Sequence, residues 1–259
     1  MDAIPVWNGP FKGRLLPRQS ATNHLSMLFG RYEPAVTSEI SRLSQPSMIA
    51  YDVGANVGYM TLALAQSLNN DGYVFAFEPV PSNIEFLRKL CSLNNLDDRV
   101  AVLPLALGEK PGKQRLVMWG SSEMHFLESA MNGQDTNHCP SVVVDSTSLD
   151  AFVFDLKNQP PNLIKIDVEG AEALVLKGAI RTLATYAPMI LTEIHGPTNA
   201  GNVWDILDAL NYRWLRLSAK GRSSVTAKEH LLTYFTKDAW THHFLMIREN
   251  KSNPGGGLT

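Results

Sequence analysis

The stretch YDVGANVGYMT (residues 51–61) decides the fold of this 259-residue chain. A short apolar run, residues 48–53, comes before a turn that contains Gly54 and Gly58, and a helix-like pattern begins at residue 59. Glycines suit such a turn because the backbone must bend tightly and let a ligand approach with no Cβ in the way. The stretch therefore predicts a strand, a ligand-binding loop and a helix, in that order.

The same alternation of apolar runs and helix-like segments repeats along most of the chain. Helix-like segments lie at residues 59–68, 82–93, 171–183 and 202–210, and strand-like runs lie at residues 48–53, 73–77, 99–107, 162–167, 188–194, 212–217 and 243–248. Nearly continuous apolar strands are typical of a parallel sheet that helices cover on both faces. We therefore predict an α/β, Rossmann-like fold with a mostly parallel sheet of seven strands.

The chain is expected to hold one main domain, residues 48–250, preceded by an arm. Residues 1–47 are expected to form this amino-terminal arm, with a helix that covers the site. Residues 110–150 break the alternation, and the runs KQRLVMW and SVVVDS within them look like an antiparallel pair in a β-rich insertion or lid. The Gly-rich residues 251–259 are expected to be a disordered tail.

Composition narrows the classes of function. The formal net charge is −2, whereas a dedicated nucleic-acid binder usually has a basic excess, so we expect no nucleic-acid partner. The chain shows neither a secretory leader nor an apolar stretch long enough to span a bilayer. A cytoplasmic protein without a membrane span is expected, and nothing in the sequence specifies an oligomeric state.

Glu78 is the second feature of the predicted ligand site. It follows the strand-like run 73–77 and lies 26 residues after Asp52, close to the spacing of a ribose-binding carboxylate in a βαβ unit. The loop itself reads G-x-x-x-G from Gly54 to Gly58, which is sparser in glycine than the pyrophosphate loop of dinucleotide-binding proteins. Together these features favour a nucleoside ligand over NAD.

Several motifs resemble those of FkbM-type methyltransferases, in the same order along the chain. They are GRYEP (30–34), DVGANVGYMT (52–61), AFEP (76–79), ALG (106–108), SLD (148–150), KIDVEGAE (165–172) and TEIH (192–195). The resemblance covers roughly residues 30 to 195. It implies a class I methyltransferase fold, S-adenosylmethionine as the methyl donor, and O-methylation of a small hydroxyl acceptor such as a sugar or polyketide.

The resemblance also implies roles for single residues. The methionine part of the donor would be surrounded by Asp52, Gly54, Asn56 and Gly58. Glu78 would hold the ribose, with Pro79 beside it and Ser82 or Asn83 assisting. Ala106 and Leu107 would lie along the adenine.

The reactive end of the site is expected where two later strands end. Asp167 ends the run 162–167, and Glu193 and His195, two residues apart, share one face of the next strand. These catalytic candidates would act either as a base with orienting carboxylates or as ligands of a hard divalent ion such as Mg²⁺. Glu172 is interpreted as an ordinary helix residue.

Two other functions are weighed against an O-methyltransferase. An NAD-dependent oxidoreductase or epimerase is disfavoured by the loop spacing and by the lack of a Tyr-x-x-x-Lys pair. A nucleoside-binding, methyltransferase-like protein without catalysis is disfavoured by the acids at Asp52, Glu78 and Asp167.

Overall fold

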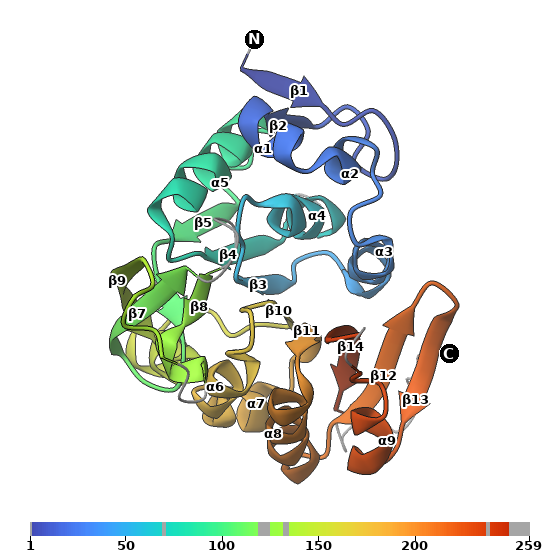
Figure 1. Ribbon diagram of the computed structural model, residues 1–259. Helices are drawn as coiled ribbons and strands as arrows, with labels where there is room; N and C mark the ends of the chain where they lie inside the picture. Colours follow the sequence, from blue (N-terminus) through green and yellow to red (C-terminus); the bar gives the residue numbers. More distant parts are fainter. Residues whose placement is uncertain (1, 69–70, 119–124, 132–134, 237–238, 249–259) are drawn as a thin grey trace.

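A computed structural model describes residues 2–68, 71–118, 125–131, 135–236 and 239–248. Within these residues the central sheet has eight strands, which follow one another across the sheet in an order that differs from the chain order (Figure 1). Across the sheet they are β13 (Gly221–Val225), β12 (Arg213–Ser218), β14 (Thr241–Ile247), β11 (Met189–His195), β10 (Leu163–Ile166), β3 (Ile49–Val53), β4 (Tyr73–Phe77) and β5 (Val100–Leu103).

The direction of these strands confirms the Rossmann-like class. Counted across the sheet from β5, the first five strands, β5, β4, β3, β10 and β11, are all parallel. Each of the next three, β14, β12 and β13, runs antiparallel to the strand before it in this order. The prediction of seven strands is wrong by one, because β13 was not foreseen. In β13 only Val225 is buried, so this edge strand has no apolar run that would reveal it.

Helices cover both faces of the sheet, as predicted (Figure 1). On one face lie α3 (Pro34–Leu43), α4 (Tyr59–Ser67) and α5 (Pro81–Leu93), and on the other lie α6 (Glu172–Lys177), α7 (Ile180–Tyr186), α8 (Pro197–Ala209) and α9 (Lys228–Leu232). Strand residues alternate between the two cores: Leu163 packs with the first set of helices, and Ile164 and Ile166 with the second. None of the described helices is long and apolar enough to cross a membrane.

The amino-terminal segment packs against the end of α5. It consists of an antiparallel pair, β1 (Ala3–Pro5) and β2 (Leu15–Pro17), followed by α1 (Arg18–Asn23) and α2 (Leu25–Leu28). The Asn94 side chain, just after α5, accepts a hydrogen bond from the Leu15 N–H and donates one to its carbonyl oxygen. These bonds hold the segment beside the sheet.

A second, smaller sheet lies beside the ends of β4 and β5. Its order is β6 (Ala106–Leu107), β9 (Ser141–Thr147), β7 (Gly112–Met118) and β8 (His125–Leu127). A 3₁₀-helix (Glu128–Ala130) follows β8, and a π-helical segment (Ala151–Asp155) follows β9. The described part of the run KQRLVMW, residues 113–118, and the run SVVVDS form the antiparallel pair expected of them, whereas Trp119 lies outside the described residues. The predicted tail, residues 251–259, lies outside the described residues.

Two predicted elements are broken in the structure. The run 99–107 is divided at Pro104, which has no backbone N–H to donate: its first part forms the edge strand β5, and its second part contributes β6 to the second sheet. The predicted helix 171–183 divides into α6 and α7 at Gly178. A Cβ on Gly178 would lie 2.1 Å from the carbonyl oxygen of Gly108, so the backbones approach too closely for any other residue.

Candidate active site

The loop after β3 is held against the end of β4 by its own backbone. The N–H groups of Gly54 and Ala55 both donate to the Phe77 carbonyl oxygen, at 3.0 Å each. Gly54 has φ of 80°, and Asn56 is also left-handed with φ of 49°. Asparagine tolerates this conformation better than most residues, which accounts for its place in the motif.

Glu78, at the end of β4, is almost completely buried, with 4% of its surface exposed. Its Oε2 accepts a hydrogen bond from the Asn56 N–H at 2.8 Å, and its Oε1 accepts bonds from the Val80 N–H at 2.9 Å and from the Asn83 amide at 3.3 Å. These donors fix the carboxylate between the loop and the start of α5. Helix α5 begins at Pro81, and the N–H of its N-cap residue, Val80, donates to Glu78.

A hollow that we call the inner pocket opens beside Glu78. Seven of the predicted donor-binding residues line it: Gly54, Asn56, Glu78, Pro79, Asn83, Ala106 and Leu107. Leu105, Leu116 and Leu127 add apolar lining, and Asp167, Val168 and Glu169 also line the pocket. A pocket with one fixed carboxylate and an apolar lining suits a nucleoside, which has a hydroxyl-bearing ribose and a flat base.

Three other predicted donor-binding residues do not line the inner pocket. Ser82 is exposed on α5, and Asn83 takes the place beside Glu78. A Cβ on Gly58 would lie 2.5 Å from the Leu87 side chain, so this glycine is needed for packing between α4 and α5. Asp52 is fully buried behind the loop.

Asp52 belongs to a buried charged chain that ends at Asp167. Its Oδ2 accepts a 2.6 Å hydrogen bond from the Thr61 hydroxyl, and its Oδ1 lies 3.8 Å from the Lys165 ammonium. Lys165 also contacts Asp167, at 3.2 Å. Burial alone would lower the pKa of Lys165, but the carboxylates of Asp167 and Asp52 outweigh it and raise the pKa, so the ammonium stays charged.

A larger hollow, the outer cleft, has a volume of about 660 Å³ and opens on the other side of Asp167. Glu193 and His195 line it from β11, as predicted, and Tyr32 and Glu33 line it from the segment before α3. The remaining walls include Phe126, Met131, Thr198, Asn199, Trp240 and Thr241. The inner pocket and the outer cleft share Asn56, Asp167 and Glu169, so the two hollows meet at these residues.

His195 is held between two carboxylates at the floor of the outer cleft. Its Nδ1 lies 2.8 Å from Glu172 Oε1, and its Nε2 lies 3.3 Å from Glu169 Oε2. Burial would lower the pKa of His195, but the hydrogen bond and charge of Glu172, with Asp167 and Glu169, raise it to about 9. The imidazole therefore carries a proton on each nitrogen at neutral pH.

Glu172 was missed as a site residue, because its position at the start of a helix is that of an ordinary acidic residue. It is completely buried. Besides His195, its carboxylate accepts hydrogen bonds from the Gly170 N–H at 3.1 Å and from the Asn199 amide. Its place inside the motif KIDVEGAE was the signal that could have identified it.

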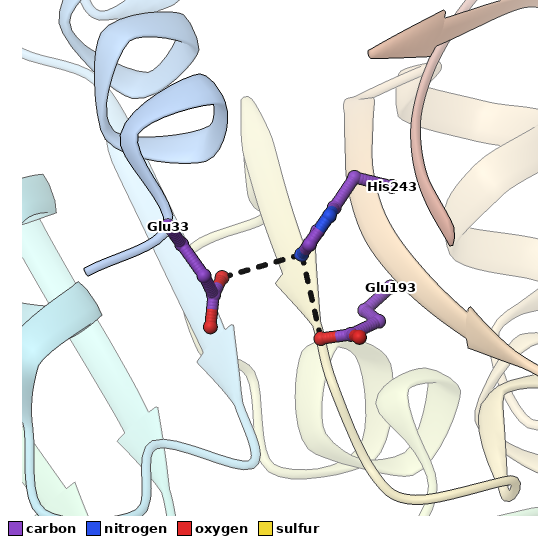
Figure 2. Close-up of side chains that lie close together, drawn as sticks. All are labelled: Glu33, Glu193 and His243. Carbon is purple, nitrogen blue, oxygen red and sulfur yellow. Dashed lines mark ion pairs between the residues drawn. The ribbon is translucent and has the colours of Figure 1, made fainter. Parts of the chain in front are cut away.

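A second histidine cluster consists of His243, Glu33 and Glu193 (Figure 2). His243 Nε2 lies 3.4 Å from both Glu33 Oε2 and Glu193 Oε2, and Glu193 is directly opposite His243 in the antiparallel pair of β11 and β14. Burial would raise the pKa of Glu193, but His243 and Thr241 outweigh it and lower the pKa to about 2. No sequence pattern marks His243, whereas Glu33 stands in the motif GRYEP.

The predicted metal ligands Asp167, Glu193 and His195 lie close enough for one ion, with donor atoms within 4.8 Å of one another. These groups already have protein partners, which a metal ion would have to displace. A histidine must present an unprotonated nitrogen to ligate, and both nitrogens of His195 face carboxylate acceptors. Asp167 already contacts the Lys165 ammonium. The same contacts of His195 suit proton transfer.

Residues 52–214 match the family described as the methyltransferase FkbM domain. The chain belongs to the FkbM methyltransferase family. The match includes both strand ends that form the inner pocket, as well as Asp167, Glu193 and His195.

Two relatives of this FkbM-family chain carry methyltransferase names. One is the hexuronic acid methyltransferase AglP of Haloferax volcanii, 28% identical over 164 residues, which are 61% of each chain. The other is methyltransferase 1 of Beauveria bassiana, 29% identical over 142 residues, or 49% of this chain and 56% of that protein. This chain therefore spans less than two thirds of the length of either relative.

A solved structure agrees with the fold. The crystal structure of methyltransferase FkbM from Methylobacillus flagellatus KT matches with a TM-score of 0.51 and 18% identity, over 86% of this chain and 52% of that chain. At this identity the match shows the shared α/β fold alone.

Proposed function

We propose that this chain transfers a methyl group from S-adenosylmethionine to a hydroxyl group of a small molecule. The observation that carries the proposal is the junction of the inner pocket and the outer cleft at Asn56, Asp167 and Glu169. A donor in one hollow and an acceptor in the other would bring their reacting groups together at this junction. Alignment of the two reactants in a protected pocket is most of what a methyl transfer requires.

The inner pocket suits the donor. Glu78 accepts the ribose hydroxyls, and Leu105, Ala106 and Leu107 lie along the adenine. The sulfonium then lies near Asp167, whose negative charge favours the cation. Asp52, Gly58 and Ser82 do not touch the donor in this assignment: Asp52 holds Lys165, and Gly58 allows α4 and α5 to pack.

The outer cleft supplies the base. The acceptor hydroxyl replaces Glu169 as the partner of His195 Nε2, while Glu172 holds Nδ1. The oxygen attacks the methyl carbon, the carbon–sulfur bond breaks, and its electron pair stays on sulfur to give S-adenosylhomocysteine. The hydroxyl proton passes to Nε2, so His195 must be neutral beforehand. Repulsion by the bound sulfonium lowers the pKa of His195 toward this state.

The pH dependence of methyl transfer tests the role of His195. With S-adenosylmethionine saturating and methyl glycosides as acceptors, kcat/KM should rise with pH and level off above an apparent pKa that is lower than the value of about 9 in the donor-free protein. Glu172→Gln removes the anion that favours the imidazolium, so the profile should move to lower pH by about 1–3 units. His195→Ala should lower kcat by on the order of 10²–10⁴, with affinity for S-adenosylhomocysteine nearly unchanged.

Two outcomes would contradict this mechanism. One is near-normal turnover in His195→Ala, and the other is an identical pH profile in wild type and Glu172→Gln. Turnover that a chelator abolishes and Mg²⁺ restores would indicate that a metal ion, rather than His195, activates the acceptor hydroxyl.

A further inference from the structure

The walls of the outer cleft carry an excess of negative charge. Its described lining residues include the carboxylates of Glu33, Asp167, Glu169 and Glu193, and they include neither lysine nor arginine. Carboxylates accept hydrogen bonds from hydroxyl groups but repel another anion at short range. The charge of the cleft therefore bears directly on which acceptors can enter.

In the described part of the chain, three cations contact these carboxylates, and each of them lies between two carboxylates. Lys165 is buried and contacts Asp52 and Asp167. His195 lies between Glu169 and Glu172, and His243 lies between Glu33 and Glu193 (Figure 2). An acceptor carboxylate would have to compete with these fixed anions for each cation.

The carboxylates also act on one another. Burial raises the pKa of Glu169, and the charges of Asp167 and Glu193 raise it further, against the opposing effect of His195. A further negative charge in the cleft would meet the same unfavourable interactions.

An exposed aromatic ring at the cleft indicates what kind of uncharged molecule fits. Trp240 lines the cleft with 59% of its surface exposed, and its ring lies against Gly196, where a Cβ would come within 2.6 Å of Trp240 Cζ2. A sugar ring has an apolar C–H face that packs on an indole, and a rim of hydroxyl groups that donate to carboxylates. The cleft offers both surfaces.

We infer that the acceptor is a sugar ring without a carboxylate and that the outer cleft excludes hexuronic acids. This inference rests on the proposed methyl transfer and narrows its acceptor. The inferred acceptor therefore differs from the hexuronic acid named for the Haloferax volcanii relative.

A matched pair of acceptors tests the inference. Nitrophenyl β-glucoside and nitrophenyl β-glucuronide differ only at the sixth carbon, which is a hydroxymethyl group in one and a carboxylate in the other. With S-adenosylmethionine as donor, kcat/KM for the glucoside should exceed that for the glucuronide by on the order of tenfold or more. Equal or faster methylation of the glucuronide would overturn the inference.

A variant in the cleft tests whether charge, rather than shape, excludes the glucuronide. Glu33→Gln replaces one carboxylate with an uncharged amide of nearly the same size, so the ratio of glucuronide to glucoside turnover should rise several-fold. Glu109→Gln, an exposed residue outside the described pockets, should leave this ratio unchanged. An unchanged ratio in Glu33→Gln would contradict exclusion by charge. Turnover of neither glycoside, with S-adenosylhomocysteine still bound, would reject the sugar while the proposed donor stands.

Discussion

Gly54 is the residue whose role differs most between sequence and structure. The motif suggests that this glycine leaves room for a ligand. In the structure, a Cβ at Gly54 would lie 1.8 Å from the carbonyl oxygen of Asp167, so the space that glycine leaves is filled by the neighbouring backbone. The glycine lets the ends of β3 and β10 approach each other, and this approach brings Asp167 to the junction of the two hollows.

Gly54→Ala should therefore destabilise the fold beyond the strain of its backbone conformation. A non-glycine residue with positive φ costs about 1–3 kcal/mol. Gly13 has a similar φ, +86° against +80° for Gly54, but a Cβ there would meet nothing within 4 Å, so Gly13→Ala is the matched control. The free energy of unfolding from urea denaturation should fall by at least about 1 kcal/mol more in Gly54→Ala. An equal loss of unfolding free energy in the two variants would contradict this prediction, because the overlap with Asp167 would then cost nothing.

At the scale of elements, the ion pairs of His243 join three parts of the chain. They connect the segment before α3, through Glu33, to β11 and β14 at the edge of the outer cleft (Figure 2). Burial would lower the pKa of His243, but Glu193 and Glu33 raise it to about 9. Because this value exceeds the ordinary pKa of about 6.5, protonation of His243 stabilises the folded state.

The stability from His243 should depend on pH in a defined direction. It is fully present below about pH 6.5 and is lost as the pH rises through about 9, while Glu193 stays ionised throughout. Thermal unfolding of wild type and of His243→Gln checks this directly. The wild type should melt at a higher temperature at pH 6, and the difference should shrink by pH 9.5. His195 is common to both proteins, so its titration cancels. A difference independent of pH would contradict the ion pair.

Some elements of the fold follow from local sequence patterns, whereas others depend on contacts between distant parts of the chain. The helix 34–43 and the parallel strands are present because their apolar spacing is local and strong. The break between α6 and α7 depends instead on contact of Gly178 with Gly108, seventy residues earlier in the chain. The edge strand β13 is set by pairing with β12 and has almost no buried side chains. Neither feature has a local pattern that predicts it.

Over the whole molecule, the donor side of the candidate site was more predictable than the acceptor side. Gly54, Asn56 and Glu78 lie at the ends of two consecutive strands, so their spacing in the sequence indicates that they lie close together in the folded protein. The acceptor side instead depends on Glu33, which lines the outer cleft, and on Glu172 and His243, which contact its lining residues on β11. These residues come from segments up to 210 positions apart. Only the folded topology brings them together, because the motifs that contain Glu33 and Glu172 do not show that these residues lie near β11, and no pattern marks His243.

The central claim is that the inner pocket binds the nucleoside of S-adenosylmethionine through Glu78. Isothermal titration calorimetry with S-adenosylhomocysteine and with NAD tests it most directly, using wild type, Glu78→Ala and, as a control on the same helix start, the exposed Ser82→Ala. We predict that wild type binds S-adenosylhomocysteine and not NAD, that Glu78→Ala binds it about 1.5–3 kcal/mol more weakly, and that Ser82→Ala binds it as wild type does. Binding of NAD in place of S-adenosylhomocysteine, or unchanged affinity in a folded Glu78→Ala variant, would contradict the account.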